Sequence, residues 1–193
     1  MYINIEGETI VRVPPSNLGA DFAKAVLDVT KESLEGRLVD IGDNPYNPKK
    51  CFVVSVTKVK MMGDGSIVHG DGGVYQTVKY ESLAFLPEMQ EIVDGIVVSV
   101  KEFGAFVKFG PMEGLLHISQ MMDDRIDIDL ANQRFVGKDT KRDLKLGDKV
   151  RAKIVLLSLP SSTLEDAKVG LNTKQMGLGK PEWIRMQKQV AGA

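Results

Sequence analysis

Hydrophobic residues in the first part of the chain follow a helical spacing. After Pro14 and Pro15, apolar side chains recur every three to four residues, at Leu18, Phe22, Ala25, Val26 and Val29. This spacing predicts an amphipathic helix that Ser16 caps at its start and that ends near Gly36.

Strand-like alternation follows this helix. Within residues 51–60, Phe52, Val54 and Val56 fall on one face, which predicts a strand. Glycine-aspartate turns at 63–65 and 70–73 then precede an apolar run. They predict tight turns between consecutive antiparallel strands, so the first half is expected to be an α+β domain.

Short apolar strands separated by glycines replace the helical spacing from residue 91 onward. They are predicted at 96–101, 105–109, 115–119, 150–156 and 169–173, with an irregular polar stretch at 123–145. Five strands within about 80 residues fit a small closed barrel of the OB type. Pro181, followed by Glu182 and Trp183, predicts a short terminal helix that its tryptophan packs in place.

The change from helical spacing to short alternating strands predicts two domains. A chain of 193 residues is long enough for each domain to have its own hydrophobic core. We expect an α+β domain over 1–86 and an all-β OB-fold barrel over 87–193. The barrel carries an insertion at about 121–146.

Charge is distributed unevenly along the chain. The formal net charge of −1 argues against a protein that coats nucleic acid indiscriminately. By segment, however, residues 1–86 carry −2, residues 87–132 carry −6 and residues 133–193 carry +7. The last segment can attract a polyanion locally, although a solvated surface of mixed charge explains the same counts.

Other features of the sequence narrow the class of protein. It contains no stretch of about 18 apolar residues and no signal-peptide pattern at its start, so we expect a cytoplasmic protein that does not contact membranes. Cys51 is the single cysteine and is expected to be a buried thiol. No cofactor is predicted.

The second strand of the barrel places unusual residues on the outside. If the apolar residues of 105–109 face the interior, alternation puts Phe106 and Lys108 on the exterior. His117 is expected to point outward as well, and Phe103 lies just before a bend. Rings beside cations suit single-stranded nucleic acid, whose bases stack while its phosphates need positive charge. The pattern alone is equally compatible with core phenylalanines in an irregular barrel and an ordinary surface histidine.

Two segments of this barrel carry a specific resemblance. Residues 95–107 read GIVVSVKEFGAFV and residues 114–119 read GLLHIS. They closely resemble the S-one RNA-binding module, which is an OB-fold. The resemblance implies that Phe103, Phe106 and His117 form a base-stacking platform.

Phosphate contacts of that module match less well. The family often has an acidic residue late in the fourth strand and an arginine in the last strand, where this chain has Ser158 and Lys168. The resemblance therefore leaves Arg151, Lys153 and Lys168 as substitutes.

The chain as a whole resembles the E-prime family of archaeal RNA polymerase subunits, counterparts of the seventh subunit of eukaryotic nuclear polymerases. The matching segments are Val13-Pro14-Pro15, Val68-His69-Gly70-Asp71-Gly72, Pro87-Glu88-Met89, Gln120-Met121-Met122-Asp123-Asp124 and Gly179-Lys180-Pro181-Glu182-Trp183-Ile184. A long loop at 42–50 and Cys51, where a glycine is more typical, are departures.

This resemblance implies an accessory subunit of a nucleotidyltransferase complex, without a catalytic site of its own. A truncated ribonucleoprotein-like domain over 1–86 would dock on the polymerase core. Pro14, Pro15, Gly63, Asp64 and Gly65 are the candidate docking residues, although the sequence alone favours a helix entry and a hairpin turn without a partner. The family also implies a heterodimer with a helical partner, the counterpart of the fourth eukaryotic subunit, and binding of emerging single-stranded RNA.

The sequence also bears on three other functions: a free-standing RNA-binding factor, a metal-binding protein and a hydrolase. A free-standing RNA-binding factor of translation or RNA decay would use the same module and stays open. The aspartates of 123–129 lack the glycine and the final glutamate of an EF-hand, so no metal is predicted. The two histidines fall in different predicted domains, and no acid–base pair for a hydrolase is visible.

Overall fold

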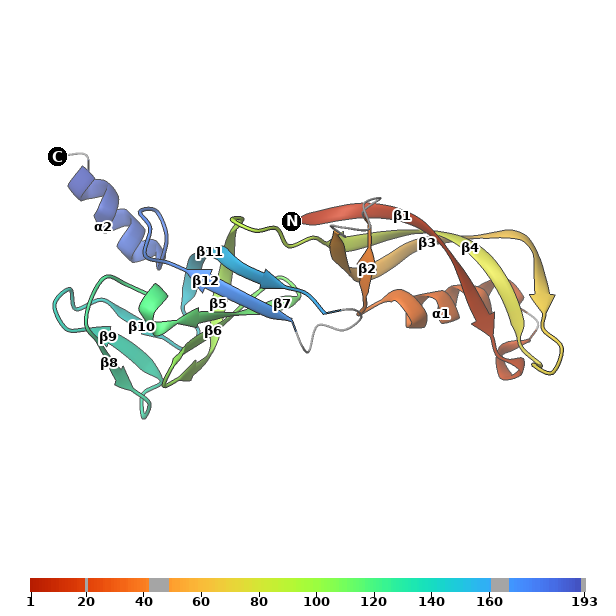
Figure 1. The fold of residues 1–193 in the computed structure, drawn as a ribbon, viewed down its shortest axis with the longest axis horizontal. Helices are drawn as coiled ribbons and strands as arrows, with labels where there is room; N and C mark the ends of the chain where they lie inside the picture. The colour runs from red at the N-terminus through yellow and green to blue at the C-terminus, as the bar shows by residue number, and fades with distance from the viewer. Residues whose placement is uncertain (20, 42–48, 161–166, 192–193) are drawn as a thin grey trace. The chain divides into compact units, whose positions relative to one another are not determined.

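A computed structural model describes the chain except for residues 20, 42–48, 161–166 and 192–193, and except for the side chains of 188–191 (Figure 1). The chain divides into two compact units. One comprises Met1–Leu86, and the other comprises most of the chain from Pro87 onward. The predicted fold class is confirmed, since an α+β unit precedes a closed β-barrel.

The N-terminal unit is a four-stranded antiparallel sheet covered on one face by a helix. Its strands are β1 (Tyr2–Val13), β2 (Leu38–Asp40), β3 (Lys50–Ile67) and β4 (Val74–Phe85), in the spatial order β1-β4-β3-β2. Helix α1 (Phe22–Leu34) packs on β1 and β3 through the fully buried Val26 (Figure 1).

The predicted start of the helix was wrong. Residues Pro15–Asn17 form the short 3-10 helix η1, and α1 begins one turn later. Asp21, not Ser16, caps α1, because its side chain accepts a hydrogen bond from the backbone N–H of Lys24 at 3.0 Å. The predicted end was correct, since Gly36 follows the helix with a φ of 79°.

The predicted turn at 63–65 was also wrong. These residues lie inside β3, as a bulge between Met62 and Ser66, which pair with successive parts of β4. The turn between β3 and β4 is formed by residues 68–73, which contain the second predicted turn at 70–73. Asp71 braces this turn by accepting hydrogen bonds from Arg12, Tyr75 and the backbone N–H of Gly73, and these interactions hold the pKa of its carboxyl group well below the usual range.

The C-terminal unit contains the predicted five-stranded barrel. Its strands are β5 (Ile92–Lys101), β6 (Gly104–Phe109), β7 (Met112–His117), β11 (Lys149–Ser158) and β12 (Lys168–Asn172). They close in the order β11-β12-β7-β6-β5, with β12 parallel to β7 and the other pairs antiparallel. The interior is filled by side chains that are almost fully buried, among them Val107, Phe109, Leu116, Ile154 and Leu171.

The stretch predicted to be irregular folds into a second sheet. Strands β8 (Ile126–Asp129), β9 (Arg134–Gly137) and β10 (Asp143–Lys145) form three antiparallel strands after the short 3-10 helix η2 (Ile118–Gln120). Their core residues, Phe135 and Leu144, are fully buried. Short strands separated by polar residues gave too little alternation to be recognised.

The acidic residues of this insertion have partners within the protein. Asp123, Asp127 and Asp129 form ion pairs with Lys174, Lys138 and Arg134, at 2.9 Å each. Asp124 accepts hydrogen bonds from Thr140 and from the backbone N–H of Asp139, which depress the pKa of its carboxyl group. These carboxylates therefore brace the loops around the small sheet.

Helix α2 (Pro181–Ala191) begins at the predicted proline, and Trp183 is 4% exposed. The guanidinium of Arg142 lies 5.8 Å from the centre of the Trp183 ring. Cys51 is fully buried as predicted, and burial raises the pKa of its thiol to about 11. Of the helices in the described ranges, none has both the length and the apolar character needed to cross a membrane.

Candidate nucleic-acid interface

Phe103 and Phe106 form a pair of rings, called the aromatic step below, where β5 turns into β6. Phe103 is 49% exposed, and its ring meets the ring of Phe106 edge to face with centroids 6.2 Å apart. Ala105 and Val107, which flank Phe106 along β6, are fully buried. The ring of Phe106 therefore points to the outside of the barrel, where it is partly exposed.

His117 stands beside this step on the neighbouring strand. It lies opposite Gly104 in the β6–β7 pairing and is exposed. A Cβ atom at Gly104 would collide with the backbone of Leu116 and His117, so the close approach of the two strands needs glycine here. The Nδ1 atom of His117 accepts a hydrogen bond from the backbone N–H of Ser119 and lies 2.7 Å from the hydroxyl of Ser119. The neutral imidazole thus carries its proton on Nε2.

A row of small and apolar residues continues the step across the barrel. Phe106 lies opposite Leu115 on β7, Leu115 lies opposite Gly170 on β12, and Gly170 lies opposite Leu156 on β11. Side chains directly opposite each other on one face are about 5 Å apart at Cβ. Leu156 is 56% exposed. The row forms a shallow apolar surface that begins at the aromatic rings.

Three of the predicted cations border this row. Lys108 and Lys168 are exposed, and each lies two residues along its strand from a member of the row, Phe106 and Gly170. Lys153 lies opposite Asn172 and is partly exposed. Positive charge thus flanks the apolar row on both sides.

The structure places some of the residues considered for phosphate contacts side by side. Ser158 and Lys168 lie directly opposite each other in the β11–β12 pairing. Glu113 lies opposite Lys108 and places a negative charge at that edge. Glu113 therefore reduces the positive potential that a phosphate would meet beside Lys108.

Arg151 has a partner of its own. Its guanidinium donates two hydrogen bonds to Asp94 on β5, at 2.8 and 3.1 Å. This pairing raises the pKa of Arg151 and lowers the pKa of Asp94. Arg151 therefore faces β5, away from the row that starts at Phe106.

Sequence reasoning missed Leu115, Gly170 and Leu156. Leu115 could have been found, because alternation with the buried Leu116 places it outside. Regular alternation along the strand predicted at 150–156 would put Leu156 on the same face as Ile154, but the structure separates them. A bulge at Val155 between them turns Leu156 to the exterior, and the alternating pattern does not reveal it.

The candidate docking residues gather at one end of the N-terminal sheet. Val74, the first residue of β4, lies between the last residue of β1, which precedes Pro14, and Ile67 of β3. A Cβ atom at Gly65 would lie 2.6 Å from Val74, and one at Gly72 would lie 3.2 Å from Pro15. The proline entry and the 63–65 bulge thus adjoin the same turn.

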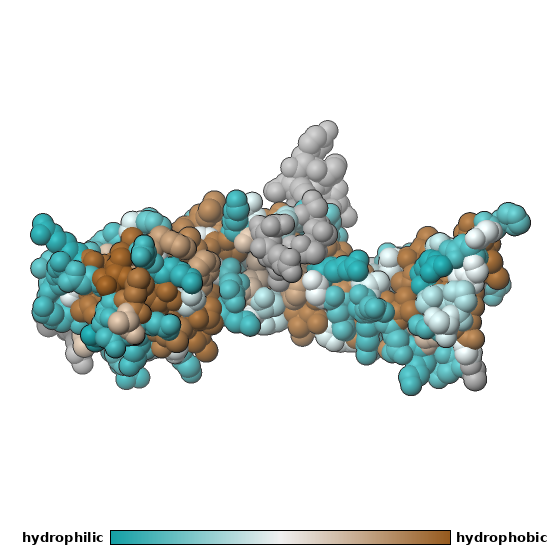
Figure 2. All heavy atoms as spheres, turned by 90° about the horizontal axis from the view of Figure 1, so that it is seen from below, coloured by the Kyte–Doolittle hydropathy of each residue, from teal (hydrophilic) through white to brown (hydrophobic). Residues whose placement is uncertain are grey.

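Large hydrophobic side chains are exposed on both units (Figure 2). At the end of the N-terminal sheet, Ile67 is 71% and Val68 is 51% exposed, and Met61 and Met62 are about 40% exposed. Clusters of exposed apolar residues of this kind often mark interaction surfaces.

Family models match both units. The S1 RNA binding domain matches residues 86–157. The SHS2 domain found in the N terminus of Rpb7p/Rpc25p/MJ0397 matches residues 8–72.

Several proteins are similar over the whole chain. The DNA-directed RNA polymerase subunit Rpo7 of Saccharolobus shibatae is 33% identical over 98% of this chain and 100% of its own length. Rpo7 of Sulfolobus acidocaldarius is 31% identical over 97% of each chain. A polyribonucleotide nucleotidyltransferase of a Bradyrhizobium species is 39% identical, but over 51% of this chain and only 13% of its own length.

Proposed function

Because the chain belongs to the Rpo7 family of DNA-directed RNA polymerase subunits and carries an S1 RNA-binding domain, we propose that it is a noncatalytic stalk subunit that holds emerging single-stranded RNA. The N-terminal unit docks on the polymerase core, and the barrel binds the transcript. A helical partner subunit completes the stalk as a heterodimer.

The observation that carries the RNA-binding role is the outer row that begins at the aromatic step. Exposed rings offer flat surfaces for bases, and stacking contributes about 1–3 kcal/mol per base with little sequence preference. The flanking lysines attract phosphates without fixing a sequence. The RNA-contacting residues proposed are Phe103, Phe106, Lys108, His117, Lys153 and Lys168, while Arg151 would have to leave Asp94 in order to contribute.

Docking is assigned to the end of the N-terminal sheet that carries Pro14, Pro15 and the 63–65 bulge. The exposed side chains of Ile67 and Val68 supply apolar area there. The closed turn, braced by Asp71 and Arg12, presents this area in a fixed shape. A preformed surface loses little conformational entropy on binding.

Two measurements test the proposal. The tagged chain, expressed in its native host, should recover the polymerase core and a helical partner subunit, whereas an Ile67→Glu variant should recover less core. Binding of a fluorescent oligouridine to the full chain should weaken as salt rises, because phosphate contacts release counterions. Recovery of RNA without any polymerase subunit would instead establish the free-standing RNA-binding factor, and RNA affinity that does not change with salt would contradict the phosphate contacts.

A further inference from the structure

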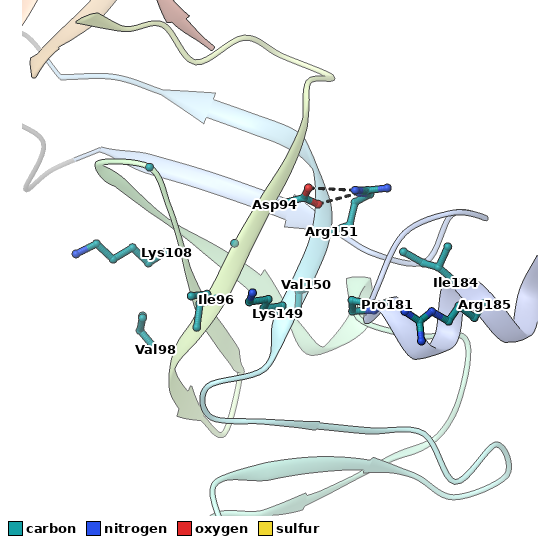
Figure 3. A pocket seen from close by; sticks show the side chains of 12 residues that line it. Asp94, Ile96, Val98, Lys108, Lys149, Val150, Arg151, Pro181, Ile184 and Arg185 are labelled. Carbon is teal, nitrogen blue, oxygen red and sulfur yellow. Dashed lines mark hydrogen bonds and ion pairs between the residues drawn. The ribbon is translucent and has the colours of Figure 1, made fainter. Parts of the chain in front are cut away.

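A second surface of the C-terminal unit is a groove of about 830 Å³ between the barrel and helix α2 (Figure 3). It crosses β5 and β11 and ends against the first turns of α2. Its apolar lining consists of Ile96, Val98, Val150, Pro181 and Ile184. This groove lies on the β5 side of the barrel, so the row from Phe106 to Leu156 does not include it.

The strand that forms the floor of this groove contains a bulge. The β5–β6 pairing shifts between Val97 and Ser99, so that Val98 is an extra residue. Val100 and Val97 face the interior, while Ile96 and Val98 are turned out and are 45% and 38% exposed. Two branched aliphatic side chains therefore stand on the surface without a covering element among the described residues.

The wall formed by α2 is firmly anchored. Lys180, at the start of the helix, is only 6% exposed and donates hydrogen bonds to Asp148 at 2.8 Å and Asp143 at 3.3 Å. Burial opposes the charge of Lys180, but these two carboxylates outweigh it and raise the pKa of the ammonium group. Arg151 and Gly179 also exchange two backbone hydrogen bonds. The groove is thus preformed.

The rim of the groove is positively charged. Lys108, Lys149, Arg151 and Arg185 line it, whereas Asp94 is the one acidic residue among the described lining residues. Asp94 is already neutralised by Arg151 (Figure 3). The three remaining cations stand around an aliphatic floor, and their charge is complementary to an acidic partner.

We propose that this groove binds an acidic amphipathic helix of a protein partner. Aliphatic residues spaced three to four apart on that helix pack on Ile96, Val98 and Ile184, and carboxylates beside them meet Lys149 and Arg185. The described lining contains no aromatic ring. RNA bases need such rings for stacking, so the floor suits aliphatic side chains and the transcript keeps to the face of Phe106.

Selection from a peptide library tests the charge and the pattern together. A displayed library of helical 18-residue peptides is selected on the full chain and compared with selection on the Ile96→Gln variant, which changes the floor without changing charge. Peptides that need Ile96 should be acidic and carry aliphatic residues at i, i+3 or i+4, and i+7. Recovery of no such peptide, or of neutral or basic ones, overturns the proposal.

Affinity measurements with the tightest-binding peptide then locate the contact. Ile96→Gln and Lys149→Glu should each weaken binding about tenfold or more, and lysine in place of the peptide's glutamates should restore binding to Lys149→Glu. Ile10→Gln, at a 65% exposed site in the other unit, and Lys145→Glu are matched controls that should change affinity less than twofold. Val98→Gln replaces Ile96→Gln if the latter unfolds.

An RNA arm distinguishes this proposal from the proposed function. Oligouridine affinity should be unchanged by Ile96→Gln. If Ile96→Gln weakens oligouridine binding and leaves peptide binding intact, the groove is an RNA channel and the helix proposal is wrong. Failure of RNA binding in every variant would count against the proposed function alone, because the peptide experiment does not depend on it.

Discussion

Replacing Phe106 and His117 by alanine tests the stacking platform most directly. The two side chains leave adjacent strands on the outer face, with Phe106 supported edge-on by Phe103 at 6.2 Å. Each alanine removes one stacking surface, worth about 1–3 kcal/mol per base. The double variant should therefore lose about 2 kcal/mol or more, which is roughly a thirtyfold rise in Kd. The loss should exceed that of either single variant.

Fluorescence anisotropy with a labelled oligouridine at fixed salt measures this loss. Tyr2→Ala is a matched control, because Tyr2 is 54% exposed and also meets a phenylalanine edge to face, in the N-terminal unit. Thermal unfolding of each variant separates a loss of RNA contact from a loss of fold. Unchanged RNA affinity in a folded double variant would refute the platform, as would an equal loss in Tyr2→Ala.

Three further predictions concern the fold. Gly104→Ala should lower the free energy of unfolding by about 1–3 kcal/mol in urea titrations, because the added Cβ atom would collide with the backbone of β7. Gly19 has open space around it, so Gly19→Ala should change the free energy of unfolding little. Because the pKa of Asp71 is depressed in the folded protein, its carboxylate stabilises the fold above about pH 4, and this stabilisation is lost as pH falls through the folded-state pKa. Asp71→Asn should therefore flatten the decline of the unfolding midpoint between about pH 4 and 2. An unaltered slope would contradict this. Cys51, buried and with a pKa of about 11, should resist a thiol reagent at pH 8 until urea unfolds the chain, and rapid labelling of the native protein would show the site to be open.

The sequence predicted the features that depend on regular periodicity. Alternation around Phe106 placed Val107 and Phe109 inside the barrel and Lys108 outside, and the structure has them so. The start of α1 was misplaced because Ser16 and Asp21 are both good caps. The choice between them depends on the 3-10 turn that Pro15 begins.

Bulges account for most of the remaining errors. An extra residue at Val98 or Val155 reverses which face the following residues occupy, yet the hydrophobic pattern continues through it without a break. Unbroken alternation would put Ile96 on the face of the buried Val100 and Leu156 on the face of the buried Ile154, yet both are exposed. A bulge is decided by pairing with the neighbouring strand, which one segment of sequence does not contain.

Each proposed surface includes residues beside one of these bulges. Without the extra residue at Val155, Leu156 would point inward and the row from Phe106 would end at Gly170. Without the one at Val98, Val97 and Val100 could not both face the interior while Ile96 and Val98 stay on the surface. Lys108 lies at the border of both surfaces, because it flanks Phe106 along β6 and also lines the groove. Since the two ligands proposed are both anionic, occupation of one surface should weaken binding at the other through this shared region of positive charge.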